Sequence, residues 1–265
     1  MTFISKLKLL IGIVAVLATG LAAPALAQSS ITSQVLKSGV LRVAIAGGNA
    51  PFSSVDPSGE AIGYDVDVAK AFAEALKVKP EFIIVDSPGR ITSLQTGKAD
   101  IAAANFTATP ERSTAVAFTE PYMVLGISFI VAASSNIKSV EDLNKDGVVI
   151  ASPRGSTADA IAQSMAPDAK RLQMESVSDA TLAVKSGQAT AQALDSLAAA
   201  TLAAKDTELR MLPGTFSYQE VAIGLPAGDF DWWRITNSWV RQFNNSGANA
   251  VLYKKWFGVD MPEIR

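Results

Sequence analysis

Residues 105–112, with the sequence NFTATPER, contain the residue types of a binding site for a small carboxylate. Thr109 is a good helix N-cap, and Pro110 suits the first helical position. Arg112 then falls in the first turn, beside unpaired backbone N–H groups and the positive end of the helix dipole. An anion is favoured there, and the planar guanidinium can hold a carboxylate with two parallel hydrogen bonds. The alternative is a capped surface helix with a solvated arginine.

The first residues have the pattern of an export signal. Lys6 and Lys8 precede an apolar run over residues 9–18, and the small-residue ending Ala25-Leu26-Ala27 follows. The run is short for a membrane span, and this order of charged, apolar and small residues is typical of a cleaved signal peptide. We expect residues 1–27 to be removed. Because a lipid anchor needs a cysteine and the sequence has none, we expect the mature protein to be free in the periplasm.

Composition limits the chemistry. The sequence contains no histidine and no cysteine, which excludes Ser-His and Cys-His nucleophilic catalysis. It also disfavours zinc and most transition-metal sites, so we expect no metal and no other cofactor. Removal of the signal leaves 21 basic and 25 acidic residues, a net charge of −4. An acidic chain argues against nucleic acid as a partner. A carboxylate–lysine enzyme remains open.

Strand and helix patterns alternate along the chain. Strands are predicted over residues 41–45, 81–85, 100–104, 148–151, 191–194 and 221–225. Helices are predicted over residues 65–76, 90–96, 158–165, 178–185, 196–204 and 231–244, with Asp65 as the cap of the first. This order implies an α/β fold with parallel strands and right-handed crossovers.

Residues 41–257 resemble the amino-acid receptors of bacterial ABC importers. The matching words, in order, are residues 51–52 (PF), 62–69 (IGYDVDVA), 94–100 (LQTGKAD), 109–112 (TPER), 155–157 (GST), 195 (D) and 254–257 (KKWF). The resemblance implies the two-lobe type II periplasmic binding fold, in which each lobe is a mainly parallel sheet flanked by helices. It places lobe 1 at residues 31–124 and 221–265 and lobe 2 at residues 128–216. Two hinge strands, over residues 124–132 and near 217–223, are expected to join them.

The resemblance also implies a clamp for the two charges of an amino acid. Arg112 takes the carboxylate, with help from polar groups of Asn105 and Thr107. Thr157 offers a backbone N–H from lobe 2, and Asp195 takes the ammonium. The alternatives are that Thr157 and Asp195 only cap helices.

The region around the ligand side chain departs from the receptors for basic and polar amino acids. The places of an acidic and an aromatic residue before the Pro-Phe word hold Ala46 and Asn49, and an aromatic after the second strand is replaced by Ser87. The aromatic sandwich of that subgroup is therefore largely missing. Phe52 either remains as a wall of the site or packs in the core.

Arg90, three residues after Ser87, resembles the second arginine of the glutamate/aspartate receptors. A second arginine suits a carboxylate-bearing side chain, and a basic ligand would lack an acidic partner at position 46. We therefore expect a polar or acidic amino acid, with Arg90 and Arg154 setting the preference. The alternative is that Arg90 points to solvent.

Three functions are open. The first is a monomeric binding protein, not an enzyme, that delivers an amino acid to a membrane permease. Its ATPase would be a separate subunit, because the chain has no phosphate-binding loop. The second is a periplasmic dehydratase of the prephenate or arogenate type, with Glu60, Glu120 or Glu175 as the general acid. The third, a receptor sensor domain, is disfavoured because no membrane-spanning stretch follows the matched region.

Overall fold

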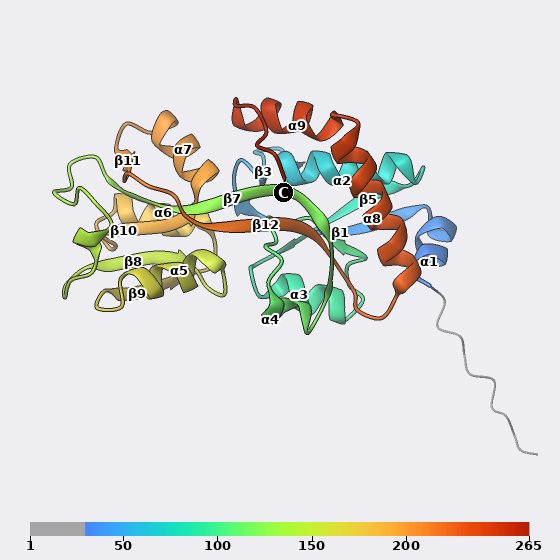
Figure 1. Ribbon diagram of the computed structural model, residues 1–265, viewed down its shortest axis with the longest axis horizontal. Coiled ribbons are helices and arrows are strands. Elements are labelled where there is room, and N and C mark those ends of the chain that lie inside the picture. Colours follow the sequence, from blue (N-terminus) through green and yellow to red (C-terminus); the bar gives the residue numbers. More distant parts are fainter. Residues whose placement is uncertain (1–29, 265) are drawn as a thin grey trace, which may run out of the picture.

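The computed structural model describes residues 30–264 (Figure 1). The predicted signal peptide lies outside these residues. The main sheet has the strand order β5-β1-β6-β12-β7-β10-β8-β9, with β11 paired to β7. Its strands are β1 (Val40–Ala46), β5 (Lys79–Val85), β6 (Ile101–Ala102), β7 (Ala117–Ala132), β8 (Val149–Pro153), β9 (Lys170–Met174), β10 (Ala191–Asp195), β11 (Leu209–Met211) and β12 (Phe216–Leu225).

A small antiparallel sheet and the helices complete the fold. The small sheet contains β2 (Gly48–Asn49), β3 (Ser53–Val55) and β4 (Ala61–Ile62). The helices are α1 (Ile31–Ser38), α2 (Tyr64–Ala75), α3 (Gly89–Gln95), α4 (Pro110–Ser113), the 3₁₀ turn η1 (Glu141–Leu143), α5 (Thr157–Met165), α6 (Val177–Lys185), α7 (Ser196–Lys205), α8 (Phe230–Asn245) and α9 (Ala248–Phe257).

The long antiparallel strands β7 and β12 run through the middle of the molecule (Figure 1). On one side, Gly224 of β12 pairs with Ala102 of β6. On the other side, β7 pairs with β10, from Asp195 opposite Ile127 to Ala191 opposite Val131. We call the side with β1, β5, β6, α1–α4, α8 and α9 the first half, and the side with β8–β11 and α5–α7 the second half. The predicted crossings fall on β7 and β12, and we propose that the two halves are the predicted lobes.

Away from the crossing strands β7 and β12, the strands of the main sheet pair in parallel within each half, as predicted. β1 pairs in parallel with β5 and β6, and β8 pairs in parallel with β9 and β10. The predicted helices are all present, with ends shifted by at most one residue. The sequence analysis did not predict α1, η1, β9, β11, α9 or the small sheet. In β9 the residues are mixed and partly exposed, which gives no clear period, because this strand lies at the edge of the sheet.

The start of α2 corrects one prediction. The cap is Gly63 and not Asp65. The backbone N–H groups of Tyr64 and Asp65 donate to the carbonyls of Pro51 and Phe52, at 3.0 and 2.9 Å. The Asp65 carboxylate is therefore not needed as a cap, and its side chain is fully buried. Two of the sequence motifs that carry the resemblance, residues 51–52 and 62–69, are therefore in contact in the structure.

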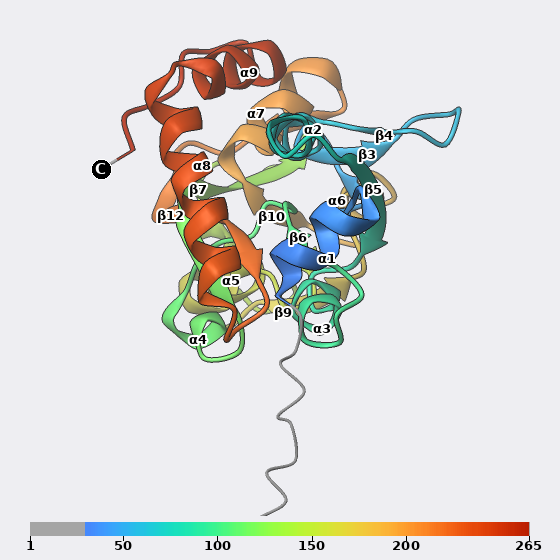
Figure 2. The same cartoon turned by 90° about the vertical axis from the view of Figure 1, so that its right-hand side faces the viewer.

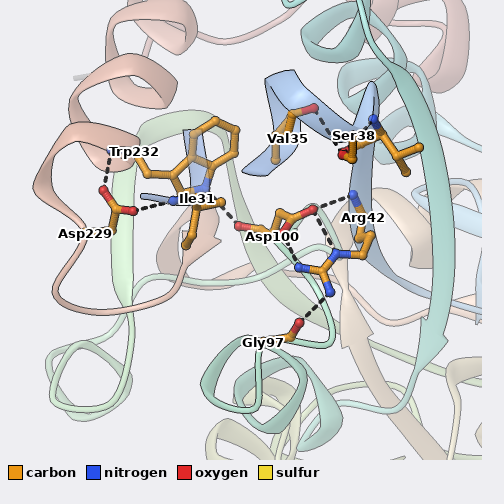
Figure 3. A network of polar contacts seen from close by, with 9 residues as sticks. Ile31, Val35, Ser38, Arg42, Gly97, Asp100, Asp229 and Trp232 are labelled. Carbon is orange, nitrogen blue, oxygen red and sulfur yellow. Dashed lines mark hydrogen bonds and ion pairs between the residues drawn. The ribbon is translucent and has the colours of Figure 1, made fainter. Parts of the chain in front are cut away.

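The C-terminal helices return to the first half. Figure 2 shows α8 and α9 along its outer side, with the C-terminus beside them. Figure 3 shows how α8 is fixed: Asp229 accepts hydrogen bonds from the N–H groups of Ile31 and Trp232, and the indole of Trp232 donates to the carbonyl of Asp100. The Asp100 carboxylate in turn pairs with Arg42. The first half is therefore built from two separate parts of the chain.

A substitution at Gly63 tests how closely the start of α2 packs against the Phe52 backbone. At this position φ is +133°, and an added Cβ would lie 2.2 Å from the Phe52 carbonyl oxygen. Gly59 also has positive φ, +89°, but a Cβ there would meet nothing within 4 Å. We expect Gly59→Ala to lower the free energy of unfolding by about 1–2 kcal/mol, from backbone strain. Gly63→Ala should cost at least about 3 kcal/mol, because the clash adds to the strain. Equal losses in urea denaturation would contradict this assignment.

Candidate functional site

A cavity lies between the two halves. Its walls come from residues 46–49, 85–90 and 104–112 of the first half and residues 153–158, 175–177 and 194–195 of the second. Its volume, about 60 Å³ for water-sized spheres, gives room for several water molecules or a small solute. Of the residues predicted from the sequence, those that line it are Asn49, Ser87, Arg90, Asn105, Thr107, Arg112, Thr157 and Asp195.

Phe52 is not among them. It is fully buried, and its ring packs against Phe257, with 5.3 Å between ring centroids. The expectation that Phe52 forms a wall of the site is therefore wrong, and the alternative of core packing holds. Arg154 is exposed and does not line the cavity either.

Arg112 reaches across the cavity. Thr109 caps α4 by accepting the Arg112 backbone N–H at 3.2 Å, and Pro110 occupies the first turn, as predicted. The guanidinium donates from Nη1 to the Thr107 carbonyl at 2.8 Å and from Nη2 to the Gly155 carbonyl of the second half at 3.1 Å. However, α4 has only four residues. The predicted contribution of a helix dipole is therefore small, and the charge of Arg112 itself is what attracts an anion.

Arg90 is buried at the back of the site. Its guanidinium lies 4.7 Å from the centre of the Phe106 ring. Nε donates to the Ser87 carbonyl at 2.9 Å, and Nη1 donates to the carbonyls of Ala104 and Asn105 at 3.1 and 3.0 Å. Burial, together with the nearby charge of Arg112, lowers the Arg90 pKa to about 9. Arg90 does not point to solvent; part of its hydrogen-bonding capacity holds the loop between β6 and α4.

The hydroxyls of Thr107 and Thr157 share one acceptor. Gln219 Oε1 accepts from Thr107 at 3.0 Å and from Thr157 at 2.7 Å, so this β12 residue ties the two halves together. Thr157 is the first residue of α5, and the cap is Ser156, which accepts the Asp159 N–H. Thr157 is therefore not the cap. Sequence reasoning missed Gln219, because a lone glutamine in a strand carries no motif.

Asp195 faces the first half from the end of β10. It occupies the N-cap position of α7, but its side chain makes no capping bond there. Instead its carboxylate accepts from Asn105 Nδ2 at 2.6 Å. Burial raises the Asp195 pKa to about 6, against the opposing effects of the Asn105 hydrogen bond and the charge of Arg90. The alternative that Asp195 only caps a helix is therefore not supported.

Two acceptors in the site have no partner. The side-chain oxygens of Asn49 and Asn105 are both buried without a hydrogen bond, and both residues line the cavity. Buried polar atoms are normally paired. These oxygens are therefore candidate acceptors for donor groups of a solute.

Within residues 30–264, no cluster of three or more histidine, cysteine or acidic side chains is arranged to hold a metal ion. In the same part of the chain, no helix has the length and apolarity needed to cross a bilayer.

The chain belongs to the bacterial extracellular solute-binding proteins, family 3, whose model matches residues 41–259. It is 32% identical over 209 residues to the ABC transporter glutamine-binding protein GlnH of Bacillus subtilis (strain 168), covering 78% of this chain and 76% of that protein. It is 27% identical over 258 residues to the L-cystine-binding protein TcyJ of Escherichia coli (strain K12), covering 95% and 96%. The resemblance predicted from the sequence is thereby confirmed.

Solved structures agree. An ancestral amino acid-binding protein, AncCDT-1, described as a precursor of cyclohexadienyl dehydratase, has a TM-score of 0.81 at 36% identity and covers 86% of this chain and 100% of its own. The P235GK mutant of ArgBP from T. maritima has a TM-score of 0.80 at 33% identity, with the same coverage. The type II periplasmic binding fold is confirmed.

Asp195 should lower stability at neutral pH. Because its folded pKa is raised, its stabilising contribution is fully present below about pH 4 and is lost as the pH rises through about 6. Asn does not ionise and is nearly the same shape. The stability of Asp195→Asn relative to the parent should therefore increase by about 2–3 kcal/mol between pH 4 and pH 7.5. Urea denaturation at both pH values measures this, and a difference that does not change with pH would contradict the burial of this carboxylate.

Proposed function

We propose that the chain is the extracytoplasmic receptor of an amino-acid ABC importer. It captures a free amino acid between its two halves and presents the closed form to a membrane permease, which a separate ATPase subunit drives. The observation that carries the proposal is the pairing of charges across one cavity: Arg112 comes from the first half and Asp195 from the second. A carboxylate and an ammonium on one carbon match this pair.

The same geometry couples binding to closure. Charge-assisted hydrogen bonds inside a cavity are stronger than those on a wet surface. A ligand that touches both Arg112 and Asp195 binds the closed arrangement better than the open one, and it therefore shifts the population toward closure. A micromolar affinity corresponds to about −8 kcal/mol, which a few such bonds together with burial can supply.

For the ligand side chain we propose a polar or acidic group. Once the carboxylate and ammonium are assigned, the remaining wall contains Arg90, Asn49 and Ser87. Position 46 holds an alanine, and the two other acids of the wall, Asp86 and Glu175, are exposed. Relatives are named for glutamine and for glutamate and aspartate. Structural neighbours include an arginine-binding protein and a protein complexed with lysine. Calorimetry across the twenty amino acids decides among them; tight lysine binding without glutamine, glutamate or aspartate binding would contradict the proposed preference.

A dehydratase is the second candidate, and one observation favours it. Glu175 lines the cavity, whereas Glu60 and Glu120 do not, and AncCDT-1 is described as a precursor of a dehydratase. Glu175 is exposed at the rim, however, and a general acid works best when it is held near the leaving group. We therefore propose a binding protein and not an enzyme. Incubation with prephenate separates the two, since a receptor returns the compound unchanged.

The remaining parts of the proposal concern the mature protein. Residues 1–27 act as a signal peptide that is cleaved after Ala27, and the product works as a monomer, free in the periplasm. Lys6, Lys8 and the small-residue ending support this export route. N-terminal sequencing of protein recovered from the periplasm tests it.

Arg112→Ala tests the carboxylate contact. We expect the affinity for the best amino-acid ligand to fall at least 100-fold in titration calorimetry, because a charged partner of the ligand is lost inside the cavity. Arg154→Ala, an exposed arginine outside the cavity, is the matched control and should keep parental affinity. Unchanged binding by Arg112→Ala, with an unchanged unfolding midpoint, would instead support the alternative of a capped surface helix whose arginine does not bind the ligand.

A further inference from the structure

Asp65 is a buried acid behind the cavity. It lies in the first turn of α2, is fully buried, and does not line the cavity. Its Oδ1 accepts from the Tyr122 hydroxyl at 2.7 Å, and its Oδ2 accepts from the Asn105 backbone N–H at 2.7 Å. A buried carboxylate is costly unless it is paired. Its two partners lie on β7 and on the loop that carries the ligand-binding residues.

Asn105 is held from three sides. Its N–H donates to Asp65, its carbonyl accepts from Arg90 at 3.0 Å, and its side-chain Nδ2 donates to Asp195 at 2.6 Å. Its φ is +47°, a left-handed conformation that residues other than glycine seldom adopt. The Asp65 bond holds the peptide in this conformation, and the conformation directs the amide toward the second half.

We infer that Asp65 is a positioning residue: its ionised carboxylate holds the Asn105 peptide so that the Asn105 amide reaches Asp195 across the cavity, and protonation of Asp65 weakens this link. A protonated carboxyl carries its own O–H donor. The Tyr122 hydroxyl can accept from this O–H, but the remaining carbonyl oxygen then holds the Asn105 N–H without the negative charge that makes such a bond strong. The link between the halves therefore depends on the charge of a residue that touches no ligand. Its consequence for affinity rests on the proposed function; the link itself does not.

The charges around Asp65 place its titration near neutral pH. Burial raises the Asp65 pKa to about 7, and the negative charge of Asp195 on β10 also raises it. The hydrogen bonds from Tyr122 on β7 and from Asn105, and the charge of Arg90 on α3, lower it. Tyr64, beside it on α2, has a pKa well above its usual range because it is buried, so it stays neutral.

Two properties should then change in opposite directions with pH. Because the folded pKa of Asp65 is raised, its contribution to fold stability is full below about pH 4 and is lost as the pH rises through 7. The link from Asn105 to Asp195 should strengthen over the same rise, because the ionised Asp65 carboxylate holds the Asn105 N–H with a charge-assisted hydrogen bond. If Asp65 had only a structural role, the fold stability and the link from Asn105 to Asp195 would change in the same direction with pH.

The ligand-free protein tests the link directly. In ¹⁵N–¹H NMR spectra between pH 5 and pH 8.5, the Asn105 backbone amide should titrate with a midpoint near 7. Tyr122→Phe should move this midpoint upward, because it removes a hydrogen bond that favours the ionised form. Asp65→Asn should abolish the titration near 7 and leave only a change near pH 6, from the neighbouring Asp195. The matched control is Asp67→Asn on the same helix, whose carboxylate contacts Lys255 and Trp256; it should leave the titration unchanged.

Affinity is the second readout, with L-glutamine and L-glutamate as probes. Neither probe changes its own protonation between pH 6 and pH 8. In the parent, the dissociation constant of the better probe should be higher at pH 6 than at pH 8 by up to about twentyfold: about tenfold from Asp65, with a pKa of about 7, and about twofold from Asp195, with a pKa of about 6. In Asp65→Asn the ratio should fall to about twofold, the part due to Asp195.

The results distinguish a failure of the positioning role of Asp65 from a failure of the proposed function. An Asn105 amide that does not titrate near pH 7 in the parent, or that still titrates with a midpoint near 7 in Asp65→Asn, overturns the inference. If Asp65→Asn does not fold, the direction of the midpoint shift in Tyr122→Phe decides, and an unmoved or lowered midpoint overturns it. If the amide titrates as expected but neither probe binds at pH 8, the positioning role stands and the proposed function fails for these ligands.

Discussion

The pairing of Arg112 and Asp195 across one cavity is the constraint on which the rest of the site depends. Both groups are partly withdrawn from water. Burial lowers the pKa of Arg112 and raises the pKa of Asp195, so it favours the neutral form of each. Protein groups compensate only in part: carbonyls of Thr107 and Gly155 hold the arginine, and the Asn105 amide holds the aspartate. In the proposed function, the carboxylate and ammonium of an amino acid complete the interactions of these two charges. Ligand binding and closure can therefore draw on the same free energy.

The sheet makes this arrangement possible. Only two strands of the main sheet, β7 and β12, pass through both halves among the described residues. In the proposed function these two strands act as the hinge. The second half has a core cluster of its own, and a larger cluster continues from the first half into α6 and α7. Around the second-half core, Phe129 and Val131 of β7 pack with Ile150 of β8 and Ala162 of α5. The site lies beside the crossing strands, where Gln219 reaches both threonine hydroxyls.

Local sequence predicted what local sequence controls. Thr109 and Pro110 specify the short turn of α4, and the alternation of strands and helices specified the α/β fold and its parallel pairing. Arg112 and Asp195 were predicted as site residues from the family resemblance, and both line one cavity in the structure. Phe52 was ambiguous because a buried aromatic and a wall of a site look the same in a sequence.

The parts that were missed depend on contacts between distant residues. Gln219 bridges the hydroxyls of Thr107 and Thr157 only because β12 passes beside Thr107 and α5. Asp65 appeared to be a helix cap, since nothing in the sequence indicates that carbonyls of Pro51 and Phe52 already satisfy the helix start. Arg90 could be placed in the site but not oriented, because its partners are carbonyls 14 and 15 residues further along the chain.

The most direct test of the account is a crystal structure of the protein with its best amino-acid ligand. We predict density for one amino acid between the halves, with its carboxylate on the Arg112 guanidinium and its ammonium on the Asp195 carboxylate. A ligand bound outside this cavity, or bound there with its carboxylate away from Arg112, would contradict the account.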